Sequence, residues 1–125
     1  MGKPCHLLAV DDSHEIRHLL ERALTDAGYT FESATSAEAA ISAMSRTKPN
    51  VVIADLWLRG LQDGLRVAAY ARSMKTPAIL VTADHLAEST LRASGFPYLL
   101  KPFTLPDLHS LIERVLRDNR EDCVV

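Results

Sequence analysis

The amino-acid sequence predicts an α/β fold, a doubly wound, five-stranded parallel sheet with helices on both of its faces. Short apolar runs alternate five times with segments of helical period along the 125 residues. The first run is continuous rather than alternating, which is typical of a strand buried on both faces. Strands that alternate with helices at this spacing form β-α-β units with right-handed crossovers, and such units build parallel sheets.

The first unit begins with a strand that we expect over Cys5–Val10. Ser13 has the hydroxyl that a helix N-cap needs, and Gly28 is suited to end the same helix. Apolar residues recur on this helix at helical spacing, so we expect one buried stripe made of Ile16, Leu19, Leu20, Ala23 and Leu24.

The second unit begins with a strand over Tyr29–Ala34, where apolar and polar residues alternate more regularly. Ser36 can cap the alanine-rich helix that follows and that runs to about Arg46. The third strand, Val51–Ala54, then leads directly into Asp55.

The middle of the chain continues the same alternation. A loop over Leu56–Asp63 precedes a helix that we place at about Gly64–Ser73. The fourth strand, Ala78–Val81, ends in Thr82, and a short helical stretch follows at about His85–Ala93.

The last unit has a brief strand, Tyr98–Leu100, and a strongly amphipathic helix. Thr104 can cap this helix, and Pro106 is tolerated in its first turn. Its expected buried stripe consists of Leu108, Leu111, Ile112, Val115 and Leu116. We therefore predict one domain over residues 1–117 and a loose polar tail over residues 118–125.

Composition excludes several classes of protein. Apolar residues make up 47% and charged residues 24% of the chain, as in globular domains. The formal net charge of −2 provides no basic face for direct nucleic-acid binding, and the last eight residues are too few for a helix-turn-helix. No apolar run approaches the ~20 residues that membrane insertion requires. Cys5 lies in an apolar run and Cys123 in the polar tail, so we expect two free thiols in a reducing cytoplasm.

Chemically active side chains follow four of the five strands. They are Asp11 and Asp12 after the first strand, Asp55 after the third, Thr82 after the fourth and Lys101 after the fifth. The carboxyl ends of parallel strands meet at one edge of the sheet, so we expect these side chains to converge there. Any one of them alone could be an ordinary turn former, helix cap or solvated charge. Their shared position at successive strand ends favours a site.

The predicted cluster has the composition of a phosphoryl-transfer site. Carboxylates forced together repel each other unless a cation neutralises them, and a few carboxylates plus water suit Mg²⁺. A lysine and a hydroxyl beside them can bind the oxygens of a phosphoryl group. One carboxylate could then attack phosphorus and form an acyl phosphate.

Four segments, in their order and spacing, are similar to the receiver domain of two-component response regulators. These segments are Asp11-Asp12, Val52-Ile53-Ala54-Asp55-Leu56, Val81-Thr82-Ala83 and Tyr98-Leu99-Leu100-Lys101-Pro102-Phe103. The resemblance extends over about residues 3–116 and implies a flavodoxin-like strand order, 2-1-3-4-5.

The resemblance also implies a role for each site residue. Asp55 would accept a phosphoryl group from a histidine kinase or phosphotransfer protein, and the domain would catalyse only its own phosphorylation and dephosphorylation. Mg²⁺ would be held by Asp11, Asp12, Asp55 and the backbone carbonyl of Trp57. Thr82 and Lys101 would bind the phosphoryl oxygens, with Thr82 and Tyr98 moving together as the switch. A cis peptide is expected between Lys101 and Pro102.

The sequence departs from the family at three places. Arg59 stands where the family usually has proline, so the loop after Asp55 is expected to be looser or differently shaped. Fewer positions than usual separate Thr82 from Lys101, which predicts a short or irregular fourth helix. Trp57 is large for its position, and we hypothesise that it shields the acyl phosphate from water and prolongs its lifetime.

Two other functions fit parts of the sequence. His14-Glu15-Ile16-Arg17-His18 matches the H-E-x-x-H pattern of zinc metalloproteases, although both histidines lie off the expected buried stripe. The domain could also bind protein partners without ever being phosphorylated, with the altered fourth-helix region as the feature that favours this alternative.

Overall fold

The structure is a computed structural model of the chain and describes residues 2–124. Its strands are β1 (Lys3–Pro4), β2 (His6–Val10), β3 (Thr30–Ala34), β4 (Val51–Asp55), β5 (Ala78–Thr82), β6 (Tyr98–Leu100) and β7 (Cys123–Val124). Its helices are α1 (His14–Asp26), α2 (Ala37–Arg46), α3 (Asp63–Ser73), the 3₁₀ turn η1 (His85–Ala87), α4 (Glu88–Ser94) and α5 (Leu105–Asp118).

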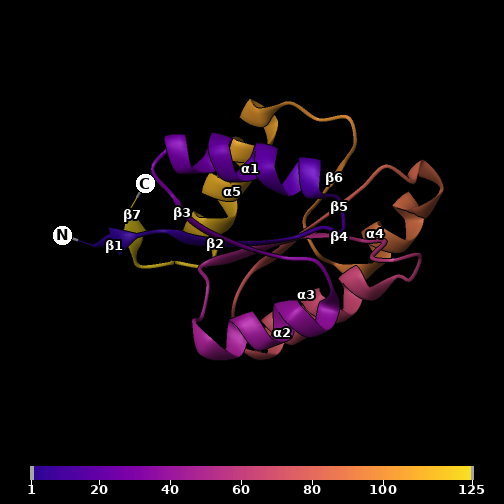
Figure 1. The fold of residues 1–125 in the computed structure, drawn as a ribbon, viewed down its shortest axis with the longest axis horizontal. Helices are drawn as coiled ribbons and strands as arrows, with labels where there is room; N and C mark the ends of the chain where they lie inside the picture. The colour runs from indigo at the N-terminus through magenta and orange to yellow at the C-terminus, as the bar shows by residue number, and fades with distance from the viewer. Residues whose placement is uncertain (1, 125) are drawn as a thin grey trace.

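The main sheet confirms the predicted fold class. Five strands lie in the order β3-β2-β4-β5-β6, and every neighbouring pair is parallel. When the short β1 is left out and the five strands of this sheet are numbered from one in chain order, the order is the predicted 2-1-3-4-5. Helices α1 and α5 cover one face of the sheet, and α2 and α3 cover the other (Figure 1).

Each face of the sheet has its own hydrophobic core. The core under α2, α3 and α4 is built largely of small residues, among them Ala40, Ala43, Ala68 and Ala71, so these helices approach the sheet closely. The core under α1 and α5 uses larger side chains, and all five residues of the predicted α5 stripe are buried there.

Helix starts agree with the predicted caps. The Ser13 and Ser36 hydroxyls accept hydrogen bonds from the backbone N–H groups of Ile16 and Ala39. Thr104 accepts from the backbone of Asp107, whose carboxylate in turn accepts from the backbone N–H of Thr104, a reciprocal pair that fixes the start of α5.

The predicted stripe of α1 is wrong at one position. Leu20 and Leu24 are buried against the sheet, but Leu19 is 55% exposed. Consecutive helical residues point about 100° apart, so a helix that buries Leu20 against a flat sheet turns Leu19 towards its flank. The sequence pattern alone does not show how narrow the strip of α1 that packs on the sheet is.

The fourth helix is short, as predicted. Asp84 accepts a hydrogen bond from the Leu86 backbone to start η1, and the seven-residue α4 follows. Only Leu91 on α4 is buried, and Gly95, with φ of 79°, ends the helix in the left-handed conformation that glycine adopts without strain. None of the helices among the described residues is long and apolar enough to cross a membrane.

The two ends of the chain lie together, which corrects two predictions. Cys5 and Cys123 form a disulfide rather than two free thiols. The expected loose tail is tied down, because Lys3 and Pro4 of β1 pair in parallel with Cys123 and Val124 of β7. Helix α5 runs back across the sheet to the edge where β2 begins, and this topology brings together cysteines 118 positions apart.

Tyr29 is a buried residue with a polar hydroxyl group. It is 2% exposed, and its hydroxyl makes no hydrogen bond among the described residues. Burial, helped by the negative charge of Glu113, raises the pKa of Tyr29 to about 12. Because the folded pKa lies above the unfolded value, ionisation of Tyr29 lowers the free energy of unfolding as the pH rises from about 10 towards 12, and below about pH 10 it has no such effect.

We expect Tyr29→Phe to raise the free energy of unfolding by about 1 kcal/mol at pH 7, because a buried, unpaired hydroxyl costs free energy. The variant should also lose less stability than the wild type between pH 10 and 12. Urea denaturation at pH 7 and pH 11 measures both effects. Tyr70→Phe, at a partly exposed hydroxyl that contacts Ser45, is the matched control. A clear loss of stability at pH 7 in Tyr29→Phe would contradict the expectation.

Candidate functional site

The predicted site residues lie at the carboxyl edge of the sheet, at the end of Figure 1 where α4 lies. Asp11 and Asp12 follow β2, Asp55 ends β4, Thr82 ends β5, and Lys101 follows β6. Backbone bonds extend the sheet to this edge, because Leu56 N–H donates to the Val81 carbonyl and Lys101 N–H donates to the Thr82 carbonyl.

Lys101 holds two of the carboxylates together. Its Nζ lies 2.8 Å from Asp55 Oδ2 and 3.3 Å from Asp11 Oδ2. All three side chains are largely buried, so water screens this triad little. A cis peptide joins Lys101 to Pro102, as expected.

The triad shifts the pKa values of its members. Burial raises the pKa of Asp55, and the hydrogen bonds from Lys101 and from the Trp57 backbone only partly offset this rise. Burial alone would lower the pKa of Lys101, but its contacts with Asp55 and Asp11 raise it instead. The ammonium is therefore firmly charged, and the Asp55 carboxylate is less well stabilised as an anion than an exposed aspartate.

Asp55 is further positioned by its own loop. Its Oδ1 accepts a hydrogen bond of 3.0 Å from the backbone N–H of Trp57. Gly64, at the start of α3, lies so close that an added Cβ would meet the Asp55 carbonyl oxygen at 2.2 Å. Any side chain at Gly64 would therefore displace the backbone of Asp55. Sequence reasoning missed this residue, and its only signal was a glycine in the first turn of a helix.

The loop after Asp55 is shaped by a tight turn, where the sequence led us to expect a looser or different form. Leu58 and Leu61 exchange backbone hydrogen bonds, and Arg59 and Gly60 both have positive φ. The Arg59 backbone N–H donates to Asp12 Oδ2 at 3.1 Å. Asp12 therefore supports this turn while Asp11 and Asp55 share Lys101.

The described residues contain no group of three or more His, Cys, Asp or Glu side chains positioned to hold a metal ion. The expected meeting of Asp11, Asp12 and Asp55 is thus present only as the Asp11–Asp55 pair, with an ammonium between the carboxylates. The chemistry of the donors still suits Mg²⁺, which binds through one or two carboxylates and keeps several waters.

Thr82 and Tyr98, the predicted switch residues, are both held by hydrogen bonds. Thr82 is fully buried, and its Oγ1 accepts from the backbone N–H of Asp84 at 3.1 Å. The Tyr98 hydroxyl donates to Glu88 Oε2 at 2.9 Å, and Arg92 pairs with the same carboxylate oxygen. Tyr98 is therefore anchored to α4 rather than turned towards Thr82.

Contacts that sequence reasoning missed join the two loops beside the site. Trp57 Nε1 donates to Asp84 Oδ2 at 3.1 Å, which links the loop after β4 to the loop after β5. His85 Nε2 lies 2.8 Å from the Lys101 backbone carbonyl, which links the second loop to Lys101. The sequence offered no periodic signal for these contacts, because Asp84 lies in the loop after β5 and His85 only begins the short η1 turn.

The metalloprotease pattern does not assemble a zinc site among the described residues. The His14 and His18 rings stack with centroids 6.3 Å apart, and His14 Nδ1 lies 3.5 Å from the Arg17 guanidinium. No third metal-binding side chain joins this pair in the described part of the chain. Arg17 also donates to the Asp11 carbonyl at 2.8 Å, so this face of α1 stabilises the backbone next to the site.

The known proteins that this chain resembles are response regulators. A family model described as the response regulator receiver domain matches residues 7–113. Response regulator MprA of Mycobacterium leprae is 35% identical over 121 residues, which is 93% of this chain and 53% of that protein. Regulatory protein AtoC of Escherichia coli is 31% identical over 116 residues, which is 89% of this chain and 25% of that protein. The chain thus spans about half of the length of the first relative and a quarter of the second.

Solved structures show the same fold. Response regulator TrrA of Thermotoga maritima, solved in complex with Mg²⁺-BeF, has a TM-score of 0.80 and 30% identity, covering 90% of this chain and 99% of that one. A CheY-like receiver domain protein of Methanospirillum hungatei has a TM-score of 0.84 at 22% identity, covering 95% of this chain and 98% of that one. The second similarity concerns the fold alone.

Proposed function

Since the chain belongs to the receiver-domain family of two-component response regulators, we propose that Asp55 accepts a phosphoryl group from a histidine kinase or phosphotransfer protein. The domain then acts as a phosphorylation-dependent switch. The observation that carries the proposal is the Lys101 ammonium, 2.8 Å from Asp55 and 3.3 Å from Asp11 at the carboxyl edge of the sheet.

The proposed reaction is an in-line displacement at phosphorus. A carboxylate oxygen of Asp55 forms the new P–O bond, and the bond to the donor breaks, which is a P–N bond in a phosphohistidine. The donor imidazole leaves with the electron pair of that bond, and Asp55 becomes an acyl phosphate. Lys101 already lies against Asp55, so its charge is in place as negative charge develops on the transferred oxygens.

Mg²⁺ is the proposed cofactor. The groups that would hold it are Asp11, Asp12, Asp55 and the backbone carbonyl of Trp57. The bound ion supplies positive charge that offsets repulsion between the carboxylates and the incoming phosphoryl oxygens. Asp11 and Asp55 would then exchange part of their contact with Lys101 for contact with the ion.

The proposed response begins at Thr82. Phosphorylation adds about −1.5 to −2 charges and three acceptor oxygens at the sheet edge. The Thr82 hydroxyl accepts from the backbone N–H of Asp84 and still has its own hydrogen to donate to one of these oxygens; a turn towards that oxygen would lengthen its bond to Asp84. The loop after β5 is then free to move, and Tyr98 can leave Glu88 and repack.

Acetyl phosphate tests the proposal directly. Incubation of the purified chain with Mg²⁺ and acetyl phosphate should add one phosphoryl mass in intact-protein mass spectrometry, and chelation of Mg²⁺ should prevent the gain. If neither acetyl phosphate nor a set of purified histidine kinases adds phosphate, the non-phosphorylated binding module becomes the better explanation.

We propose three further properties of this domain. The domain catalyses no reaction beyond its own phosphorylation and dephosphorylation. Its location is the cytoplasm, where kinases of this class draw phosphate from nucleotide. Its output runs through protein contacts or phosphate flow rather than direct nucleic-acid binding, because the net charge of −2 provides no broad basic face.

Trp57 is expected to set the lifetime of the acyl phosphate. It lies two residues after Asp55, and its indole is held over the loop by Asp84. Trp57→Asn should speed loss of phosphate about tenfold, equivalent to about 1.4 kcal/mol, because water reaches the acyl phosphate more easily. Trp57→Phe, which keeps an aromatic cover but loses the Nε1 donor, is the matched control and should stay close to wild type. Decay of the phosphorylated mass after removal of the donor measures both; equal rates for Trp57→Asn and wild type would contradict the shielding role.

A further inference from the structure

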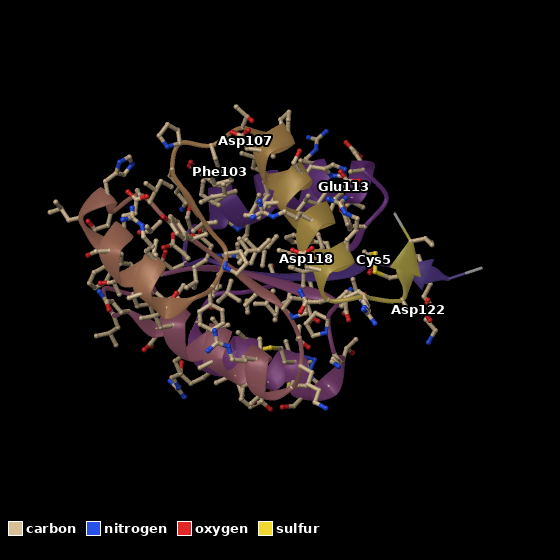
Figure 2. The ribbon with its side chains drawn as sticks, turned by 180° about the vertical axis from the view of Figure 1, so that it is seen from behind. Cys5, Phe103, Asp107, Glu113, Asp118 and Asp122 are labelled. Carbon is tan, nitrogen blue, oxygen red and sulfur yellow. A yellow bond between two sulfur atoms is a disulfide. The ribbon has the colours of Figure 1, made fainter. Side chains whose placement is uncertain are left out.

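A disulfide lies at the end of the sheet opposite the phosphoacceptor. Cys5 comes immediately before β2, whereas Asp55 lies at the carboxyl end of β4. Figure 2 shows Cys5 beside the last turn of α5, near the labelled Asp118 and Asp122. The chain contains two cysteines in all, so this pair has no competing partner within the chain.

The disulfide is accessible from outside. Cys5 is 1% exposed, while Cys123 is only half-buried. Both cysteines line a surface hollow of about 340 Å³, together with residues that include Arg117, Arg120 and Glu121. The disulfide-bonded residues therefore border a hollow that a small thiol can enter without any opening of the core.

Few other contacts hold residues 122–124 against the sheet, whereas the preceding residues 119–121 are tied to α5 and Glu121 accepts a hydrogen bond from Asn50. The pairing of β1 with β7 comprises two residue pairs and lies apart from the main sheet. Across it, the Cys5 backbone N–H donates to the Val124 carbonyl at 2.9 Å. Arg120, in the turn after α5, has φ of 52°, a conformation that L-residues other than glycine rarely adopt. A two-stranded pairing this short does not persist without a further tie.

We propose that Cys5–Cys123 is a thiol–disulfide exchange site whose substrate is a dithiol, and that its reduction releases residues 122–124 from the sheet while the Asp55 site stays intact. Release is local because the core under α2 and α3 contains no residue of β7, and the core under α1 and α5 loses only the partly buried Cys123. The proposal stands independently of phosphorylation at Asp55.

The exchange is a two-electron transfer. A thiolate of the dithiol attacks Sγ of Cys123, the S–S bond breaks, and Cys5 leaves as a thiolate that takes up a proton. The second thiolate of the dithiol then attacks the reagent sulfur that is bonded to Cys123. This step frees Cys123 as a thiolate and forms a cyclic disulfide within the reagent. The dithiol is oxidised, and the cystine is reduced to two cysteines.

The first test uses dithiothreitol as the dithiol and counts thiols. Denaturing alkylation should label no cysteine in protein kept under air and two cysteines after incubation of the native protein with dithiothreitol. Two labelled cysteines in the air-oxidised protein, or none after native treatment with the reagent, would overturn the proposal.

The second test follows backbone hydrogen exchange in the same two samples. The Cys5 amide, which donates to Val124, should exchange at least tenfold faster after reduction, whereas the Trp57 amide, which donates to Asp55, should not change. Cys123→Ser should show the fast Cys5 exchange with or without dithiothreitol, and it leaves the buried Cys5 in place. Unchanged exchange at Cys5 after full reduction would show that the disulfide does not hold residues 122–124 in place. Equal acceleration at Trp57 would show that the effect of reduction is not local.

Discussion

Asp55→Asn should abolish the covalent phosphorylation of this domain by acetyl phosphate. An amide oxygen is a far weaker nucleophile than a carboxylate oxygen, and no other carboxylate at the site has the same surroundings. Asp11 is buried against Lys101, and Asp12 Oδ2 is engaged by the Arg59 backbone. We therefore expect complete loss of the added mass rather than a slower gain.

The same variant should remain folded, so the loss can be assigned to chemistry. Burial raises the pKa of Asp55, which means that its protonated form is favoured in the folded state and that its charge opposes folding at neutral pH. In Asp55→Asn that charge is absent, and Lys101 keeps Asp11 as a partner. Urea denaturation at pH 7 should show a midpoint no lower than that of the wild type.

Intact-protein mass spectrometry with Mg²⁺ and acetyl phosphate measures the expected loss. Asp63→Asn, a change at the first residue of α3 outside the triad, is the matched control and should be labelled like the wild type. Full labelling of Asp55→Asn would place the phosphoacceptor elsewhere and would remove the basis of the proposed function.

Lys101→Met should cause the largest loss of stability, about 3 kcal/mol at pH 7 in the absence of Mg²⁺. The methionine fills a similar volume but leaves Asp11 and Asp55 facing each other with no cation. Removing one partner of a buried ion pair costs this much because the remaining charges are neither hydrated nor neutralised. The three side chains are mostly buried, so solvent screening reduces the cost only slightly.

The pH dependence of this variant has a definite sign. Without the ammonium, the pKa of Asp55 rises further, because the contacts that lower it are gone. A raised carboxyl pKa means that stability increases as the pH falls through that value and the charge is lost. In the wild type, the raised pKa of Lys101 means that its stabilisation is complete below about pH 10.5 and is lost at higher pH. The difference in the free energy of unfolding between wild type and Lys101→Met should therefore become smaller in acid and in strong alkali.

Chemical denaturation from pH 5 to pH 11, with and without millimolar Mg²⁺, measures these effects. If Mg²⁺ binds the carboxylates, it should restore much of the lost stability, since it replaces the missing cation. Lys75→Met, which removes an exposed lysine far from the triad, is the control. Equal stability of Lys101→Met and wild type at pH 7 would mean that the triad contributes nothing to folding.

Measurement of Mg²⁺ binding also distinguishes two explanations for the position of Lys101 between Asp11 and Asp55. The described residues provide no ready-made group of three metal ligands, and Lys101 occupies the space between Asp11 and Asp55. If the ammonium substitutes for the metal, Lys101→Met should bind Mg²⁺ more tightly than the wild type. If Lys101 instead orients the carboxylates for the metal, the variant should bind Mg²⁺ more weakly.

Local signals in the sequence were sufficient for most of the fold. The serine and threonine caps and the five apolar runs are properties of neighbouring residues, and they were confirmed at Ser13, Ser36 and Thr104 and in the strand order. The short fourth helix, which was predicted from the departure from the usual family spacing, was confirmed as well. The sequence also predicted that Asp11, Asp55 and Lys101 lie at one edge, because the carboxyl ends of parallel strands are all on the same side of the sheet.

Only the tertiary structure decided contacts between segments that are distant in the chain. The pairing of Cys5 with Cys123, the bond from Trp57 to Asp84 and the sharing of Lys101 between two aspartates depend on where separate elements meet to within an ångström or so. Periodicity and capping describe which face a residue presents, not which side chain it meets there. The sequence therefore determined where the reactive groups gather, and packing of the folded chain determined how they are paired.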